Sequence, residues 1–302
     1  MANRKILSYV LLGVLAVGAA AVVVSRSFSA AETTVSDLTG ETHFHGIAVD
    51  PRNPDRLYLA THHGFFAVGP DGVAQRVSET EDDFMGFTPH PADPEVLYAS
   101  GHPAGGGNLG FIVSRDGGQT WAKLSDGADG PVDFHQMDIS KADPQVIYGV
   151  YGELQKSTDG GRSWSRVGPA PEGIIGLSAS SLDTDRLYAA TRTGLLVSTD
   201  GGQSWRPAHG SQQLASMVQV TPEGTVYAFI AGSGLLQTEE PGLQWTALGN
   251  DFGRALVLHL AAGKGEEAQR RLYVVTFDPE TRSQALYGSR DGGRSWTRLG
   301  AA

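Results

Sequence analysis

The chain has 302 residues, of which 40 are glycine and 15 proline, an apolar fraction of 40% and a formal net charge of -10. This length suffices for one large domain or two small ones, and the apolar fraction excludes a collagen-like or wholly disordered chain. The negative charge argues against nucleic acid as a partner, and the absence of cysteine excludes disulfides, thiolate metal sites and a cysteine nucleophile.

The first element in chain order is an apolar segment at the amino end. The basic residues Arg4 and Lys5 precede residues 6–24, which carry no charge. This length predicts a membrane-spanning helix, although small residues at 29–31 also suit a cleaved signal peptide. In both cases the positive amino end predicts export of the rest of the chain. We therefore expect 1–31 to be an anchor or signal peptide and 32–302 to be anchored outside the cell membrane, or secreted or periplasmic after cleavage.

An eight-residue motif recurs along the remainder of the chain. Four copies share a Ser, an Asp two residues later, a pair of glycines and a final Trp, at residues 114–121, 157–164, 198–205 and 289–296. A degenerate copy lies at 238–245 and a shorter one at 68–72. Successive copies begin 40 to 51 residues apart, so residues 32–302 contain six units.

A tyrosine precedes each copy of the motif, at Tyr58, Tyr98, Tyr148, Tyr188, Tyr227 and Tyr273. Short alternating apolar segments surround these tyrosines and are bounded by Gly, Pro, Asp or Asn, which is typical of strands. Each unit therefore predicts four strands and no helix. Units of this size predict an all-β, six-bladed β-propeller, with blades at about 40–83, 84–130, 131–171, 172–211, 212–250 and 251–302.

The repeated Asp, Gly and Trp residues suit a tight turn between two strands. The Asp accepts hydrogen bonds from turn N–H groups, the glycines supply positive φ, and the Trp packs between sheets. We predict structural roles for Asp116, Asp159, Asp200, Asp291, Trp121, Trp164, Trp205, Trp245 and Trp296.

This motif resembles the Asp box, or BNR repeat, of sialidases, sortilin-type receptors, xyloglucan-cleaving glycosidases and photosystem-assembly propellers. The chain is similar to bacterial exported BNR proteins that resemble glycosyl hydrolases. The resemblance implies a propeller over the whole exported region, with the boxes on the face opposite the binding site. A sialidase is not expected, because the early Arg-Ile-Pro segment of that family is absent and only two arginines map near the binding face.

Histidines are concentrated in the first half of the chain. In a propeller blade the start of the first strand and the end of the second lie beside the central channel. Counting back from the tyrosines places a set of possible metal ligands there: His43, His45, His62, His63, His102, His135 and Met85. Imidazole with thioether favours copper, and imidazole with carboxylate favours zinc, iron or manganese. The sequence predicts a transition-metal or ligand site, and a polar channel mouth that merely tolerates histidine is the alternative.

Three carboxylates and two arginines are further candidates. Asp83 and Asp133 map to the same mouth, and Glu153 replaces the glycine that opens the third strand in other units. A pair of carboxylates at such a mouth would suit glycoside hydrolysis, although an exposed acidic turn explains them equally. Arg192 and Arg254 are candidate ligand-binding residues.

Three functions remain open on the sequence alone. The first is a propeller that binds a ligand, with a transition metal such as copper or zinc, at the histidine-rich mouth. The second is a glycosyl hydrolase acting on an extracytoplasmic glycan. The third is a platform for protein assembly or a receptor. The ligand is accordingly a small molecule, a glycan or a protein. Two ways of closing the ring remain open: 297–299 forms the outer strand of the last blade, or 34–38 donates a strand to that blade instead. We expect 263–271 to be a solvated loop.

Overall fold

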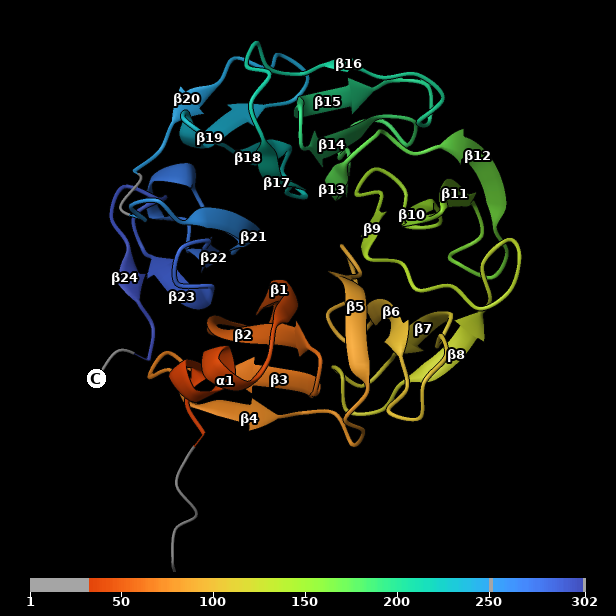
Figure 1. The fold of residues 1–302 in the computed structure, drawn as a ribbon, viewed down its shortest axis with the longest axis horizontal. Helices are drawn as coiled ribbons and strands as arrows, with labels where there is room; N and C mark the ends of the chain where they lie inside the picture. Colours follow the sequence, from red (N-terminus) through yellow and green to blue (C-terminus); the bar gives the residue numbers. More distant parts are fainter. Residues whose placement is uncertain (1–32, 250–251, 301–302) are drawn as a thin grey trace, which may run out of the picture. The chain divides into compact units, whose positions relative to one another are not determined.

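The computed structural model describes residues 33–249 and 252–300. Within them, six four-stranded antiparallel sheets follow one another around a ring, and the first strand of each sheet lies innermost (Figure 1). Each inner strand contacts those of the two neighbouring blades, and the last blade contacts the first. The predicted all-β six-bladed propeller is therefore confirmed.

The first three blades follow the chain order. Blade one contains β1 (Phe44–Asp50), β2 (Asn53–Thr61), β3 (Gly64–Val68) and β4 (Ala74–Arg76). Blade two contains β5 (Asp83–Pro89), β6 (Leu97–His102), β7 (Phe111–Ser114) and β8 (Ala122–Ser125). Blade three contains β9 (Gln136–Ile139), β10 (Ile147–Tyr151), β11 (Glu153–Ser157) and β12 (Ser165–Pro169).

The last three blades repeat this arrangement. Blade four contains β13 (Ile174–Ala179), β14 (Leu187–Thr191), β15 (Gly194–Ser198) and β16 (Arg206–Pro207). Blade five contains β17 (Ala215–Val220), β18 (Thr225–Ile230), β19 (Gly234–Glu239) and β20 (Thr246–Ala247). Blade six contains β21 (Leu256–Ala262), β22 (Leu272–Asp278), β23 (Ser283–Ser289) and β24 (Thr297–Arg298), so the outer strand expected at 297–299 is present.

Apolar clusters between successive blades form the core. The cluster between blades one and two joins Phe65 of β3 to Phe84 of β5, and equivalent clusters fill the other spaces between blades. The repeated tyrosines belong to this core, since Tyr148 and Tyr188 are fully buried. Because both faces of every sheet are covered, the alternating apolar segments fold as a ring rather than as an open sheet.

The Asp boxes have the structural role expected for them. In the third blade, Asp159 Oδ1 accepts hydrogen bonds from the N–H groups of Arg162 and Ser163, both at 2.9 Å. The Ser163 hydroxyl and N–H hold the pKa of Asp159 down at about 2. Trp164 packs its ring against Phe134, with centroids 4.8 Å apart. Asp116 and Asp291 accept the same two N–H hydrogen bonds, and Asp200 Oδ1 accepts from the N–H of Ser204.

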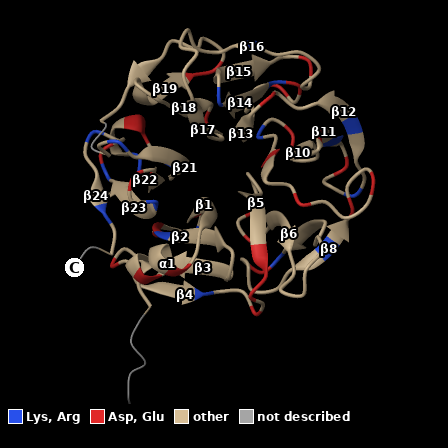
Figure 2. Ribbon diagram, in the orientation of Figure 1, with Lys and Arg blue, Asp and Glu red and all other residues tan. Residues whose placement is uncertain are grey.

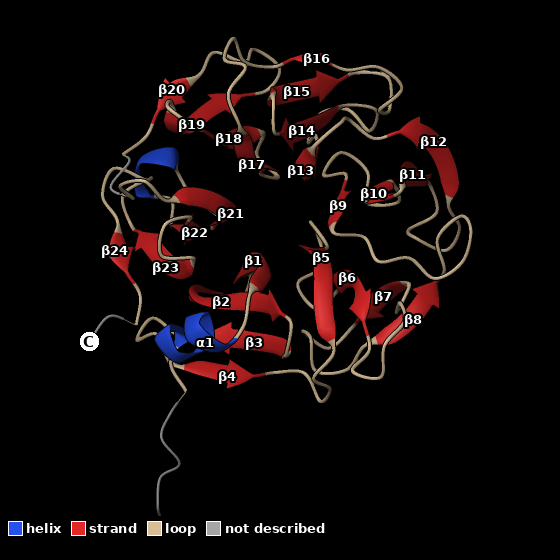
Figure 3. Cartoon of the chain, in the orientation of Figure 1, coloured by secondary structure: helices blue, strands red, loops and turns tan. Residues whose placement is uncertain are grey.

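A short helix covers the junction between the first and last blades. Helix α1 (Val35–Glu41) begins with a capping box between Thr34 and Asp37 and overlaps blade one in the view of Figure 3. Val35 is buried in a cluster with residues of both blades, and Thr34 pairs with Val73 of blade one. The second way of closing the ring, a strand at 34–38 in the last blade, is therefore wrong, because the capping box favours a helix at this point.

The insertion in blade six is not a simple solvated loop. It contains a turn of 3₁₀ helix, η1 (Glu267–Gln269), followed by Arg270, which is only 5% exposed. Arg270 Nη1 donates to Thr225 Oγ1 at 2.9 Å and to the Tyr227 hydroxyl at 3.2 Å. This part of the insertion therefore binds blade five to blade six.

The predicted membrane anchor or signal peptide at 1–31 lies outside the described residues. Across 33–249 and 252–300, no helix has the length and apolar character needed to cross a bilayer. Lys and Arg residues are scattered around the ring among Asp and Glu residues (Figure 2).

Candidate functional site at the channel mouth

The two faces of the ring carry different chemistry. Because each sheet is antiparallel, the start of its first strand and the end of its second lie at one end of the central channel, which we call the channel mouth. The turn after the third strand, which holds the Asp box, lies at the other end. The contact between Gly117 N–H in a box and Glu95 O, in the loop after the first strand of blade two, fits this arrangement. The histidine-rich segments and the boxes therefore lie on opposite faces.

A β-bulge near the start of the first strand gives His45 its position. In blade one the pairing with β2 shifts between Phe44 and Gly46, so His45 is an extra residue in β1. Such bulges often re-aim a side chain beside a functional site. The same register shift makes Ile175 the extra residue in the first strand of blade four and Ser216 the extra residue in that of blade five.

Blade six departs from the predicted register. Its shift falls between Val257 and His259, so Leu258 is the equivalent of His45. Arg254, predicted at this position, precedes β21 and forms an exposed ion pair with Glu280 at 3.3 Å. Leu258 lies 15 positions before Tyr273, and His45 lies 13 before Tyr58, so the insertion at 263–271 lengthens the count by only two. Arg254, 19 positions before Tyr273, was reached by allowing for a longer insertion.

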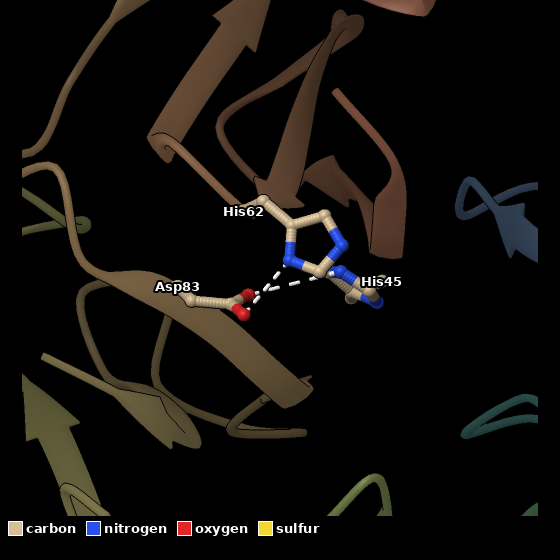
Figure 4. A group of neighbouring side chains, drawn as sticks. All are labelled: His45, His62 and Asp83. Atoms are coloured by element: carbon tan, nitrogen blue, oxygen red, sulfur yellow. Dashed lines mark hydrogen bonds and ion pairs between the residues drawn. The ribbon is translucent and has the colours of Figure 1, made fainter. Parts of the chain in front are cut away.

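The first histidine group consists of His45, His62 and Asp83, from the starts of β1 and β5 and the end of β2 (Figure 4). One ligand atom from each residue lies within 4.8 Å of the others. His62 Nδ1 is 2.8 Å from Asp83 Oδ2, and His45 Nε2 is 3.7 Å from Asp83 Oδ1. The two imidazole rings meet edge to face, with centroids 4.2 Å apart.

The second histidine group consists of His102, Asp133 and His135, from the end of β6 and the segment before β9. Asp133 Oδ2 lies 3.0 Å from His102 Nε2 and 2.7 Å from His135 Nε2. The Asp133 side chain is only 7% exposed, whereas both histidines are open to solvent. A buried carboxylate is thus enclosed by two accessible imidazoles.

The orientation of His102 directs its Nε2 atom at a carboxylate. His102 Nδ1 lies 2.8 Å from the Gly107 carbonyl oxygen, which can only accept, so Nδ1 carries a proton. In the neutral ring Nε2 then has a lone pair that faces the Asp133 carboxylate. Two such acceptors approach to 3.0 Å only with a proton or a metal ion between them.

Three buried polar atoms of the two groups have no hydrogen-bond partner. They are His45 Nε2, Asp83 Oδ1 and Asp133 Oδ1. A buried acceptor without a partner is costly, and such atoms call for an explanation by an ion, a water molecule or function. Four other such atoms lie elsewhere among the described residues, on Asp55, Arg186, Gln237 and Arg271, and these three gather at the channel mouth.

Protonation distinguishes the two groups. Burial, together with the neighbouring imidazoles of His62 and His259, lowers the pKa of His45 to about 3. His45 is therefore neutral near pH 7 and offers a lone pair. In the second group, the hydrogen bond with Asp133 raises the pKa of His135, so a proton competes with any metal ion there.

One ligand spacing of the first group, between His45 and Asp83, suits a metal ion. Zinc–nitrogen and zinc–oxygen bonds are about 2.1 Å long, so two ligands of a tetrahedral site lie about 3.4 Å apart. The 3.7 Å between His45 Nε2 and Asp83 Oδ1 is too long for a hydrogen bond and close to that value. Three protein ligands also leave a coordination position open for water or a substrate, as in catalytic rather than structural zinc sites.

The other predicted ligands lie at the edges of the groups. His43 and His63 are exposed, with ring centroids 5.7 and 6.3 Å from that of His62. Met85 is buried on β5, two residues beyond Asp83 and so on the same face of that strand.

Two further candidates lie apart from both groups. Glu153 opens β11 and, with Tyr151 and Arg166, lines a separate hollow of about 320 Å³. Its carboxylate is 3.6 Å from the Arg166 guanidinium, an exposed ion pair. Arg192 is exposed and packs over the turn at Gly173. The structure therefore does not join Glu153 or Arg192 to the histidine groups.

His259 is a residue of the mouth that the sequence did not indicate. It lies on β21, its Nε2 donates to the Phe44 carbonyl oxygen at 3.1 Å, and burial lowers its pKa to about 4. It also lowers the pKa of His45. Thirteen residues separate His45 from Tyr58, and the same count back from Tyr273 reaches Leu260, next to His259, so a fixed count would have found it.

Comparisons with known proteins agree with this architecture. The family described as BNR/Asp-box repeat matches residues 112–123 and 196–207. The chain is 28% identical over 195 residues to an oligoxyloglucan-reducing end-specific xyloglucanase of Emericella nidulans, which covers 54% of this chain and 23% of that enzyme.

Solved structures show the same fold. A GH74 xyloglucanase from Xanthomonas campestris matches with a TM-score of 0.55 at 20% identity, over 86% of this chain and 45% of that one. A chain of a nidogen–laminin complex matches with a TM-score of 0.55 at 10% identity, over 81% and 92% of the two chains. This chain therefore spans less than half the length of either xyloglucanase. It is a six-bladed β-propeller that carries BNR/Asp-box repeats at 112–123 and 196–207, it is 28% identical to a xyloglucanase over part of its length, and it shares its fold with another.

Proposed function

We propose that this protein is an exported propeller that binds its ligand at the channel mouth with the help of a transition-metal ion. The observation that carries the proposal is the coincidence of three unpartnered buried acceptors with two sets of imidazole and carboxylate ligands. Neutral imidazole and carboxylate are ligands that zinc, iron and copper accept. The amino-terminal segment supports export, and anchoring in the membrane is part of the same proposal.

Metal content tests this proposal directly. The full-length chain, purified in detergent, is expected to carry a stoichiometric transition metal or to take up Zn²⁺ after treatment with a chelator. Zn²⁺ at 100 times its Kd should raise the free energy of unfolding by about 2.7 kcal/mol. His45→Ala with His135→Ala should abolish this gain, whereas His209→Ala, in the loop after β16, should retain it. A chain that neither holds nor is stabilised by any first-row transition metal would refute the proposal.

A second candidate, hydrolysis of an extracytoplasmic glycan, is the one that the comparisons favour. The curated relative from Emericella nidulans is a xyloglucanase, and so is the Xanthomonas campestris protein that shares the fold. Asp83 and Asp133 supply two carboxylates at one mouth, as glycoside hydrolysis requires. In their present contacts, however, Asp83 Oδ2 lies 2.8 Å from His62 Nδ1 and Asp133 Oδ2 lies 2.7 Å from His135 Nε2, so each carboxylate is engaged with an imidazole and neither is a free general acid.

The hydrolase has its own test. Incubation with xyloglucan oligosaccharides and a wider glycan panel should release reducing sugar, and Asp83→Asn or Asp133→Asn should abolish release. Glu153→Gln shows whether the carboxylate in the separate hollow takes part. Turnover that survives complete removal of metal would support the hydrolase and not the metal site. Absence of turnover, with a partner protein that binds regardless of both sets of substitutions, would favour an assembly platform.

A further inference from the structure

We infer that the channel mouth binds two transition-metal ions side by side, one in the first histidine group and one in the second. This inference rests on the proposed function, which requires only that the mouth binds metal. It adds the stoichiometry and the division of the ligands between the ions.

Each group is a complete ligand set by itself. The first offers two imidazoles and the Asp83 carboxylate, and the second offers two imidazoles and the Asp133 carboxylate, with no residue shared. Within each group the three ligand atoms lie within 4.8 Å of one another. Two histidines and one carboxylate make up the protein ligands of many open zinc and iron sites, so neither group needs a donor from the other.

The two groups meet at one pair of residues in blade two. Asp83 of the first group and His102 of the second are direct partners across the antiparallel β5–β6 pair. The Cα atoms of such partners lie only about 4.5 to 5.5 Å apart. Antiparallel pairing thus places two ligand sets beside each other although their residues span 45 to 135 in the sequence.

Gly101 allows β5 and β6 to pair closely beside Asp83 and His102. Its φ is +130°, and a Cβ atom there would lie 1.9 Å from the Asp83 carbonyl oxygen. Any other residue at this position would push β5 away from β6 next to His102. The close pairing of Asp83 with His102 therefore depends on a glycine beside them.

Each group also has its own unmet need for a cation. In the first group, His45 Nε2 and Asp83 Oδ1 are both buried and without a hydrogen-bond partner. In the second group, Asp133 Oδ1 has no partner, and His102 Nε2 lies 3.0 Å from Asp133 Oδ2. One ion at either place would leave the acceptors of the other unsatisfied.

Two ions at the mouth would be near neighbours, because Asp83 of one group and His102 of the other are cross-strand partners. The carboxylates of Asp83 and Asp133 would balance part of the charge of the two ions.

Zn²⁺ stoichiometry tests the inference. The metal-free full-length chain, titrated calorimetrically with Zn²⁺ and analysed for bound metal after desalting, is expected to bind two ions. His62→Ala and His102→Ala should each reduce the number to one, and the double variant should bind none. His209→Ala, away from the mouth, should still bind two. Circular dichroism verifies that each variant is folded.

A measurement on the unaltered chain covers the case in which a variant does not fold. Co²⁺ absorption should rise until two equivalents have been added, and a plateau at one equivalent would overturn the inference. If the unaltered chain binds one Zn²⁺ and both single variants bind none, the two groups share one ion. If the unaltered chain binds one Zn²⁺ and only His62→Ala binds none, a proton and not a metal ion holds the second group together. Both results overturn the inference but leave the proposed function intact, whereas no binding at all refutes the proposed function itself.

Discussion

Gly161, in the Asp box of blade three, lies directly against Phe111 of blade two. A Cβ atom at Gly161 would lie 2.1 Å from Phe111 Cε1, and the glycine has a φ of +84°. The second glycine of other boxes is equally confined, since a Cβ at Gly118 or Gly202 would lie 2.4 Å or less from a side chain of the preceding blade. The box therefore shapes its own turn and also seats one blade against the next.

Gly161→Ala should lower the free energy of unfolding by about 3 kcal/mol, because it adds backbone strain and a clash with a buried ring. Urea denaturation measures the change. Gly210→Ala is the matched control, since nothing lies within 4 Å of its Cβ position and its φ is ordinary. Equal stability of the two variants would contradict the seating role of Gly161.

Asp138 should be the most sensitive acidic residue for stability. It is buried on β9, accepts from Thr88 Oγ1 of blade two at 3.1 Å and Ser178 Oγ of blade four at 2.7 Å, and pairs with Lys141. Asp138→Ala leaves a buried ammonium without its partner and should cost about 3 to 5 kcal/mol.

The double variant Asp138→Ala with Lys141→Met should recover part of this loss, because no uncompensated charge remains buried. A double-mutant cycle from denaturant unfolding gives the coupling between the two residues. Simple additivity of the two single effects would show that the ion pair is unimportant.

Arg270 should hold blades five and six together. Arg270→Met removes its hydrogen bonds to Thr225 and Tyr227 and should lower the free energy of unfolding by about 2 kcal/mol. Lys264→Met, an exposed position of the same insertion, should have little effect. Thermal unfolding measures the stability of the two variants. A larger loss of stability for Lys264→Met than for Arg270→Met would argue against this role of Arg270.

The Asp boxes should make stability depend on acid pH. Hydrogen bonds from Ser163 lower the pKa of Asp159 from 3.8 to about 2. The unfolded chain therefore binds more protons between these values, and the free energy of unfolding should fall as the pH is lowered from about 4 to 2. Above pH 4 this contribution is fully present.

Asp159→Asn removes the titrating group and should show a shallower decline over the same pH range. Urea unfolding at a series of pH values from about 2 to 6 compares it with the unaltered chain. Identical slopes for both proteins would show that the box carboxylate does not contribute to acid sensitivity.

The repeats made the ring predictable from the sequence. Motifs such as 114–121 and 157–164 recur at blade length. Counting back from the tyrosines, by 13 positions for His45 and Ile175 and by 11 for Ser216, placed these residues correctly at bulges. In blade six the allowance for the insertion was too large, which led to Arg254 instead of Leu258. Helix α1 was not predicted because one short capped turn resembles a strand in its apolar content.

The division of the histidines into two groups could not be predicted in this way. Register places His62 and His102 at the same end of their blades, but the partner of each imidazole depends on contacts between blades. Asp138 was missed for the same reason, since a single acidic residue in an alternating strand gives no indication of the buried bonds it makes to two neighbouring sheets. These features belong to the space between repeats, which repeat spacing does not describe.

Each sheet consists of four consecutive strands, so the ring closes without a strand exchanged between its ends. Gly300 lies against Val35, since a Cβ atom on Gly300 would be 2.7 Å from Val35 Cγ1. A short peptide could therefore connect residue 300 to residue 33, and new termini could be opened between any two blades without dividing a sheet. The domain is therefore suited to circular permutation, in which the amino terminus is placed before a different blade and every four-stranded sheet stays intact.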